Sequence, residues 1–292
     1  MEIIKTYADL KKVKNRTIRT VARNIILSGL SFVYNNYRFN DLIRKPRVQF
    51  LYFHHLFPDE IENFRLFLSV ISKYHEFISY SEAVDRIINR DIDRPYIAFS
   101  TDDGFKTNLM FANELEEFGA TACFFINPNS IGLTDNDDIK RFCIDRLNFP
   151  PVEFLNWDDL DNLLSRGHEI GSHTMSHINI ANASEIDIKD DMRKTFELLS
   201  NKFGKVQHFA FPFGTFNHFK KSAISAVYEA GFISCASAVR GCHINHNAEL
   251  IQRDLCIRRD HIIAGWNINH ILYFLLNNSK CANTYNNLFP YT

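Results

Sequence analysis

Short apolar segments alternate with segments of helical periodicity through most of the chain, and this alternation constrains the fold more than any other feature. Repeats of strand, helix and strand produce a parallel sheet with helices packed outside it, and the simplest closed form of that arrangement is a barrel. A chain of 292 residues, 46% of them hydrophobic, can bury one large core of this type. The predicted strands are 48–53, 96–100, 121–126, 168–172, 209–211 and 232–237, and the predicted helices are 59–74, 80–90, 107–118, 157–165, 185–203 and 220–230.

Polar residues follow these apolar strands at the points where the strands are expected to end. His54 follows the first strand, Asp102 and Asp103 follow the second, His173 the fourth, and a turn at Pro212 the fifth. Ligands bind at the carboxyl ends of the strands in parallel α/β folds. We therefore expect these side chains to converge on one site.

Two of these segments carry chemistry that is suited to a metal ion. Asp102-Asp103-Gly104 places adjacent carboxylates at a turn, and Gly104 permits the sharp reversal that brings them to different sides of one site. His173 and His177 are spaced so that both imidazoles face the same way on a helical turn. Two histidines and one carboxylate leave positions open for water and substrate, as a catalytic zinc site requires. Taken singly, the Asp-Asp-Gly segment is better explained by a polar turn, and the histidine pair by two surface histidines.

The order of the segments is more specific than any one of them. It resembles the polysaccharide deacetylases of carbohydrate esterase family 4, which share the homology domain of rhizobial chitooligosaccharide deacetylases, from about residue 48 to about residue 255. The resemblance implies a distorted (β/α) barrel, for which we expect about seven parallel strands, and a metal-dependent deacetylase acting on an N-acylated amino sugar. The segments that carry it are Tyr52-Phe53-His54-His55, Phe99-Ser100-Thr101-Asp102-Asp103-Gly104, Gly167-His168-Glu169-Ile170-Gly171-Ser172-His173-Thr174-Met175-Ser176-His177 and Phe209-Ala210-Phe211-Pro212-Phe213-Gly214.

The resemblance also implies a role for each residue of the predicted site. Asp103, His173 and His177 would bind a divalent metal, for which zinc is the expected ion, and Asp102 would be the general base. The backbone N–H of Phe213 would donate to the oxyanion that forms during hydrolysis.

A general acid must protonate the departing amine, and here the sequence departs from the usual family pattern. Most members carry this histidine in a C-terminal leucine-x-histidine segment, to which His261 and His270 correspond only loosely. A circularly permuted subgroup carries a tyrosine-histidine pair on the first strand instead, and the chain resembles that subgroup. We therefore assign the acid to His54 and keep His55 as the alternative, because a shift of one residue reverses the direction of a side chain on a strand.

A second departure concerns the charge partner of Asp102. The arginine of the family's arginine-x-proline segment is replaced by Ala210. Arg253, in Leu250-Ile251-Gln252-Arg253, fits an arginine found after the last strands of permuted members, so we predict it as the replacement. The alternative for Arg253 is a surface salt bridge. The long polar stretch 133–156 is predicted to be a binding loop.

Positive charge is concentrated near the N-terminus. Residues 1–50 contain 11 Lys/Arg and 3 Asp/Glu, a balance of +8, whereas residues 51–292 contain 22 and 31, a balance of −9. We predict a helical extension over 1–46, with a helix at 8–37, and a catalytic domain over 47–292. The extension is a candidate for peripheral membrane contact through anionic lipid, and the alternatives are a solvated helix or one that packs on the barrel.

The remaining features bear on location and substrate. The net charge of −1 argues against nucleic acid as a partner. Six scattered cysteines without a C-x-x-C pair, and the lack of a convincing cleavage site or membrane span, favour a cytoplasmic enzyme that works at the inner membrane face. We expect a role in surface-polysaccharide biosynthesis, with a nucleotide- or lipid-linked amino sugar as substrate. The competing interpretations are a secreted enzyme acting on finished polysaccharide, a sugar N-deformylase, and a non-catalytic carbohydrate-binding relative.

Overall fold

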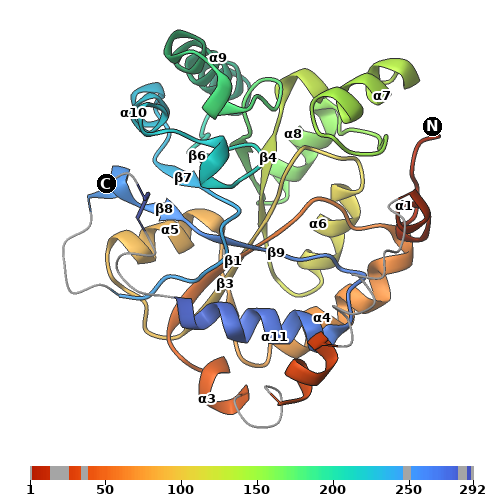
Figure 1. The fold of residues 1–292 in the computed structure, drawn as a ribbon, viewed down its shortest axis with the longest axis vertical. Helices are drawn as coiled ribbons and strands as arrows, with labels where there is room; N and C mark the ends of the chain where they lie inside the picture. Colours follow the sequence, from red (N-terminus) through yellow and green to blue (C-terminus); the bar gives the residue numbers. More distant parts are fainter. Residues whose placement is uncertain (1, 14–25, 34–38, 246–250, 282–287, 291–292) are drawn as a thin grey trace.

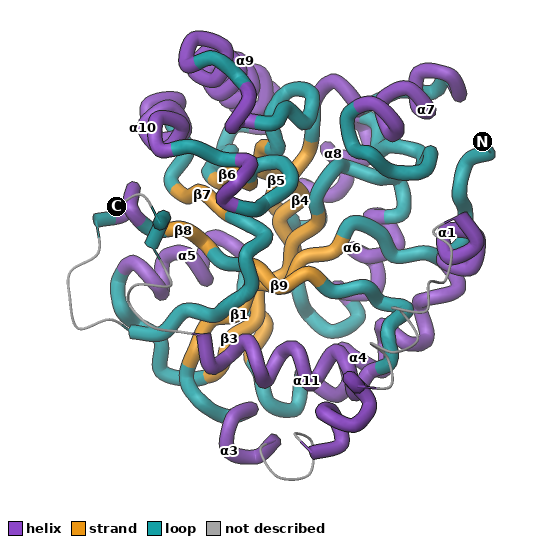
Figure 2. The backbone as a smooth tube through the Cα atoms, in the orientation of Figure 1, coloured by secondary structure: helices purple, strands orange, loops and turns teal. Residues whose placement is uncertain are grey.

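The centre of the molecule is a parallel sheet with helices around it (Figures 1 and 2). The structure, a computed structural model, describes residues 2–13, 26–33, 39–245, 251–281 and 288–290. The main path of the sheet runs β8-β7-β6-β5-β4-β3-β1-β9, with β2 paired beside β3. The strands are β1 (Arg47–Phe53), β2 (Glu76–Phe77), β3 (Pro95–Thr101), β4 (Ala122–Ile126), β5 (Glu169–Ser172), β6 (His208–Ala210), β7 (Ser234–Ala236), β8 (Cys256–Ile257) and β9 (Arg259–His261).

The sheet curls into a nearly closed barrel, which confirms the predicted fold class. Its two edges, β8 and β9, are joined by Arg258 alone, so the chain itself brings the edges together. All strand pairs in the described sheet are parallel. The structure has nine strands where the sequence predicted about seven, and β2 and β8 are only two residues long.

The helices follow the predicted alternation, with additions. All six predicted helices are present: α8 and α9 coincide with their predictions, and the other four differ from theirs by a few residues at one or both ends. Two described helices were not predicted: α7 lies within the supposed loop 133–156, and α11 follows the last strand. The helices are α1 (Tyr7–Val13), α3 (Phe39–Ile43), α4 (Ile61–Ile71), α5 (Tyr80–Ile88), α6 (Asn108–Glu116), α7 (Asn136–Asp145), α8 (Trp157–Ser165), α9 (Glu185–Phe203), α10 (Lys221–Ala230) and α11 (Ile268–Asn278), with short 3-10 turns at Pro58–Glu60, Pro128–Ser130, Ile180–Asn182, Phe216–His218, Gln252–Asp254 and Ser279–Cys281.

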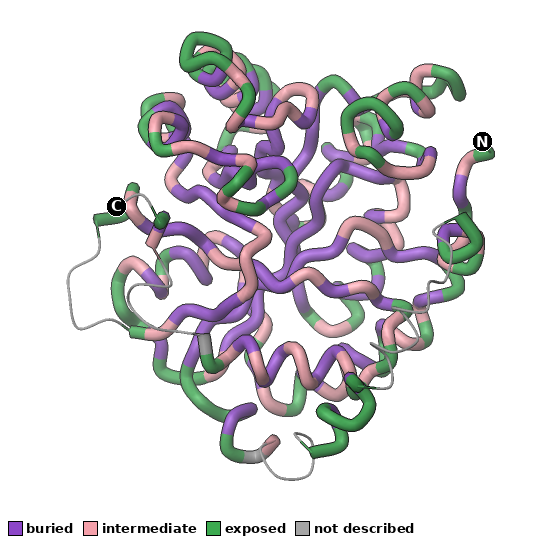
Figure 3. Tube along the Cα trace, in the orientation of Figure 1, coloured by how far each residue is buried: buried purple, intermediate pink, exposed green. Residues whose placement is uncertain are grey.

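The strands are buried along almost their whole length (Figure 3), and alternation along them divides the core into an inner and an outer part. Phe50 and Ala98, paired across β1 and β3, belong to a cluster that also contains residues of β4, β6, β7 and β8. The guanidinium of Arg259 on β9 lies over the ring of Phe125 on β4, 5.0 Å from its centroid, although β9 and β4 are not neighbours in the sheet. Such a contact across the sheet shows that this face lies inside the barrel. Leu51 and Phe99, the next pair, pack outward against the helices. The side chain of a strand residue therefore enters the barrel at every second position.

The N-terminal extension is described in two parts. Helix α1 is held against the barrel by Asp59, whose carboxylate accepts from the backbone N–H groups of Tyr7 (2.8 Å) and Ala8 (2.9 Å). Residues 26–33 are also helical. The other parts of the predicted helix 8–37, residues 14–25 and 34–37, lie outside the described residues. Within the part of the chain that is described, no helix has the length and apolarity to cross a bilayer.

Candidate metal and catalytic site

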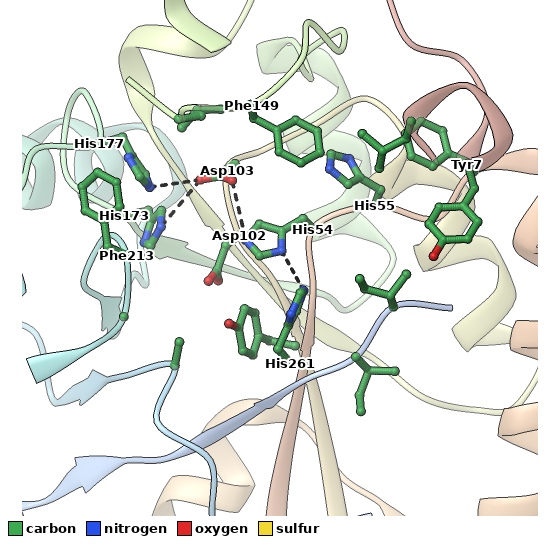
Figure 4. A pocket seen from close by; sticks show the side chains of 18 of the residues that line it. Tyr7, His54, His55, Asp102, Asp103, Phe149, His173, His177, Phe213 and His261 are labelled. Carbon is green, nitrogen blue, oxygen red and sulfur yellow. Dashed lines mark hydrogen bonds and ion pairs between the residues drawn. The ribbon is translucent and has the colours of Figure 1, made fainter. Parts of the chain in front are cut away.

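The predicted polar residues meet at the carboxyl ends of the strands. They line a cavity of about 280 Å³ into which β1, β3, β5, β6 and β9 direct their ends (Figure 4). Histidines and aspartates occupy one part of it and aromatic and aliphatic side chains the rest. The residues that line the cavity include His54, His55, Asp102, Asp103, Phe149, His173, His177, Phe213 and His261, together with Tyr7, Leu10, Phe57, Glu60 and Ile263.

Asp103, His173 and His177 form a buried cluster whose three ligand atoms lie within 4.8 Å of one another. The Nε2 atoms of His173 and His177 each lie 3.6 Å from Oδ1 of Asp103. This separation is too long for a hydrogen bond and suits three atoms that face a common point. Oδ1 of Asp103 is buried and accepts no hydrogen bond from the described residues.

The histidines are oriented so that their free lone pairs face Asp103. The Nδ1–H of His173 donates to the carbonyl of Ala210 (2.7 Å), and that of His177 donates to the carbonyl of Arg146 (2.9 Å). Nε2 of each ring then carries the lone pair, which is the arrangement of a metal-ligating histidine. Burial lowers the pKa of both histidines, that of His177 to about 3, so both rings are neutral.

These lone pairs and the Asp103 carboxylate would repel one another without a cation between them. Burial, and then the neighbouring charge of Asp102, raise the pKa of Asp103. A divalent ion reverses that effect, because its charge favours the ionised carboxylate. The three residues therefore fit a divalent metal.

Left-handed backbone conformations shape the cluster. Asp103 (φ 73°) and His177 (φ 54°) both have positive φ, as do Thr174 and Phe213 beside them. Such conformations are unfavourable for residues with a side chain and persist where the surrounding structure fixes them, commonly at functional sites. At Asp103 the conformation, continued by Gly104, turns the chain so that two successive carboxylates both face the cavity. The sequence predicted that Gly104 alone would permit this reversal of the chain.

Asp102 continues the inward alternation of β3 and meets Arg259, the first residue of β9. The guanidinium donates to both carboxylate oxygens, NH1 to Oδ1 (2.7 Å) and NH2 to Oδ2 (2.9 Å). Burial would raise the pKa of Asp102, but Arg259 outweighs it and lowers the pKa to about 2. Asp102 is therefore ionised.

The prediction that Arg253 is the charge partner of Asp102 is wrong. It lies in an exposed 3-10 turn, Gln252–Asp254, whereas Arg259 is fully buried. Strand β9 pairs with β1, and Arg259 points into the barrel as its neighbour in the register, Phe50, does.

The middle of the chain carries the sequence signature of a known family. Residues 89–232 match the family described as polysaccharide deacetylase. This part of the chain belongs to the polysaccharide deacetylase family. No curated protein matches the chain.

Solved structures of deacetylases share the fold. IcaB from Ammonifex degensii is 14% identical, with 80% of this chain and 98% of that one covered and a TM-score of 0.61. The deacetylase PplD of Streptococcus pyogenes, solved with acetate, is 14% identical over 78% and 98% of the two chains, with a TM-score of 0.59. A de-N-acetylase from Aggregatibacter actinomycetemcomitans is 17% identical over 78% and 99%, with a TM-score of 0.57. At these identities the likeness establishes the fold, and the circular permutation of the motifs stays a prediction.

His54 lies between the cluster of Asp103, His173 and His177 and a second histidine, His261. Its Nε2 is 3.8 Å from Oδ2 of Asp103, and its Nδ1 is 3.2 Å from Nε2 of His261 at the end of β9. The structure thus brings together His54 and His261, whereas His270 lies on α11 and contacts Ser28. His261 could have been assigned from its spacing to Arg259, because residues two apart on a strand share a face.

His55 takes a different place in the cavity. Its ring stacks on Phe57 (5.1 Å between centroids) and on Phe149 (4.8 Å). It belongs to an aromatic wall of the cavity, while His54 is the histidine beside Asp103. Position by itself favours His54 for proton transfer near the cluster.

The turn after β6 brings a backbone donor beside the cluster. Phe213 (φ 61°) and Gly214 (φ 63°) are both left-handed, and the Phe213 ring contacts that of His177 at 4.6 Å. A Cβ on Gly214 would lie 2.1 Å from that of Ala238, so this close approach requires glycine. The N–H of Phe213 donates to no described residue, which leaves it available to a ligand.

Proposed function

We propose that the protein is a metal-dependent hydrolase that removes an N-acetyl group from an amino sugar during surface-polysaccharide biosynthesis. The observation that carries this proposal is the buried cluster of Asp103, His173 and His177 in the cavity of a polysaccharide deacetylase barrel. A divalent metal held there would lower the pKa of a bound water and polarise the acyl carbonyl. We propose zinc, since two imidazoles and one carboxylate suit it and leave an open coordination position.

The cavity supplies a proton acceptor next to this cluster. Asp102 is ionised, lines the same cavity and is held rigidly by Arg259. It accepts the proton of the water that attacks the acyl carbon, as a general base. Arg259 positions the carboxylate and does not itself meet the substrate.

Two further groups act on the charges that develop during the reaction. The N–H of Phe213, a residue that lines the cavity, donates to the carbonyl oxygen as it becomes an oxyanion. His54 protonates the departing sugar amine, and His261 holds its ring through the contact at Nδ1.

The test uses the full-length protein loaded with zinc and a panel of N-acetylated and N-formylated amino sugars. We expect release of acetate, one zinc per chain, and loss of both in the His173→Ala and His177→Ala variants. His270→Ala is the matched control and should retain zinc and activity. Stoichiometric zinc in both cluster variants would contradict the site. Formate release alone would indicate a deformylase, and sugar binding without release of either acid a non-catalytic relative.

We also propose that residues 1–46 contact the cytoplasmic face of the membrane, near a lipid-linked amino sugar. The charge balance of +8 over residues 1–50 supports this, as do Ile26 and Phe32, which are 63% and 68% exposed on the helical segment 26–33. Full-length protein should sediment with anionic vesicles at low salt, and Ile26→Asp/Phe32→Asp should not. Equal sedimentation of both, or none by the wild type, would contradict the contact, and a nucleotide-linked sugar would be the better substrate.

A further inference from the structure

The N-terminal helix forms part of the cavity that holds the catalytic groups. Tyr7 and Leu10 of α1 line it together with Phe57, Glu60 and Ile263. In Figure 4 Tyr7 lies on the opposite side of the cavity from His173 and His177. The cavity is thus bounded by the metal cluster at one end and by α1 at the other.

Specific contacts fix this end wall in place. Asp59 accepts from the first N–H groups of α1, as a helix cap supplied by a distant part of the chain. The Tyr7 ring lies against Gly265, where a Cβ would come within 2.3 Å of the ring. The N–H of Gly265 donates to Oε1 of Glu60 (2.7 Å), and Oε2 of Glu60 accepts from the N–H of Phe57 (3.0 Å). These contacts join α1, the turn after β1 and the turn after β9 into one wall.

The wall offers groups that a sugar can use. The Tyr7 hydroxyl is half-buried and forms no hydrogen bond with any described residue. It can donate to a sugar hydroxyl and accept from another. The stacked rings of His55 and Phe149 give an apolar face beside it, against which the C–H face of a sugar ring can pack.

The size of the cavity limits what it can hold. Its volume of about 280 Å³ is just below the usual range for ligand cavities, ~300–1,000 Å³. This suits one sugar ring with its acyl group. A polymer that continued from that ring toward Tyr7 and Leu10 would have to pass through α1.

We propose, on the basis of the proposed deacetylase function, that α1 closes the sugar cavity, so that the enzyme acts on a single or terminal N-acetylated amino sugar and not on an internal unit of a polymer. Tyr7 determines this specificity by donating to a hydroxyl of the bound sugar. Asp59 and Gly265 are positioning residues that hold Tyr7 in the wall.

The first experiment compares N-acetylglucosamine with its β-1,4-linked pentamer, using the zinc-loaded full-length protein. The wild type should deacetylate the monosaccharide and one end of the pentamer, as located by mass spectrometry. Asp59→Ala removes the charged cap of α1, and Gly265→Ala displaces the Tyr7 ring by collision. In each variant, internal deacetylation should appear. The pentamer-to-monosaccharide ratio of kcat/KM should rise in both variants. In Asp59→Ala the rise should be about tenfold, the effect expected from losing the charged hydrogen bonds that hold α1. Hydrogen exchange in α1 verifies that the helix has been released.

The second experiment removes one hydroxyl and keeps the wall. Tyr7→Phe should lower kcat/KM for the monosaccharide by about 2- to 10-fold, the effect of one hydrogen bond, with unchanged zinc content and α1 protection. Lys12→Ala is the matched control on the same helix, because the Lys12 side chain is 77% exposed. It should change nothing.

The outcomes separate this proposal from the proposed function. Internal deacetylation by the wild type, or an unchanged ratio in a variant whose α1 is released, would overturn the end wall. If no probe loses acetate, the deacetylase function has failed, and calorimetric binding of N-acetylglucosamine decides the role of the cavity. Weaker binding by Tyr7→Phe than by Lys12→Ala would then support the sugar site, and equal binding would refute it.

Discussion

Replacing Arg259 by methionine would test the ion pair that holds the Asp102 carboxylate. Arg259 is fully buried, donates twice to Asp102 and also donates to the carbonyl of Ser237 (3.0 Å). Methionine fills similar space without charge, and it leaves the Asp102 carboxylate buried and unpaired. Breaking such a pair from one side costs about 3–5 kcal/mol of unfolding free energy. That is a large part of the roughly 5–15 kcal/mol that stabilises a typical protein.

The assay is urea unfolding of the chelated protein, so that loss of metal does not add to the effect. Arg253→Met is the matched control, and as an exposed substitution it should change stability by less than about 0.5 kcal/mol. Arg259→Lys should recover part of the loss, because lysine restores charge without the two-pronged geometry. In a double-mutant cycle, Arg259→Met with Asp102→Asn should lose less than the sum of the single variants, by about 2–3 kcal/mol.

Either of two results would refute the stabilising role of the pair between Arg259 and Asp102. One is a loss below about 1 kcal/mol in Arg259→Met, which would match an exposed rather than a buried ion pair. The other is additivity in the cycle, which would mean that Arg259 and Asp102 do not stabilise one another. A loss in Arg253→Met equal to that in Arg259→Met would show that the wrong arginine has been assigned to Asp102.

Three further predictions concern the site. Asp102→Asn should retain zinc but lose hydrolysis by about 10²–10⁴-fold, as measured by metal analysis and acetate release, and full activity would contradict its role as base. His54→Ala should lower kcat far more than His55→Ala, and the reverse would transfer the role of acid. Gly214→Ala should lower the unfolding free energy by about 1–3 kcal/mol through backbone strain and collision. Urea unfolding should show a larger loss of unfolding free energy for Gly214→Ala than for Gly119→Ala. Gly119 is also left-handed, but an added Cβ there would have no neighbour within 4 Å.

Local patterns in the sequence were sufficient for the strands and for the metal cluster. The first strands are short apolar runs whose alternation is visible in the chain, and the polar residues directly after them had to lie at one end of a parallel sheet. The spacing of His173 and His177 and the Asp-Asp-Gly turn are also local. The structure places these residues around one point.

Helix α7 was not predicted from the local sequence pattern. The stretch 133–156 was interpreted as a long loop because its apolar residues are sparse. It contains a helix capped by Asp135, with Ile139 and Cys143 buried one turn apart. Tertiary packing of a narrow apolar face was enough to stabilise a helix whose composition is mostly polar.

The strand–helix alternation, the barrel and the identity of the cluster residues could be predicted from the amino-acid sequence, because each follows from neighbours within a few positions. The pairing of Arg259 with Asp102, the contact of His261 with His54 and the position of Tyr7 in the cavity wall are visible only in the folded protein. Each of these contacts joins residues that are more than 40 positions apart in the chain. They depend on the register of β9 beside β1 and on the docking of α1, and a one-residue change in register turns every side chain of a strand to the opposite face.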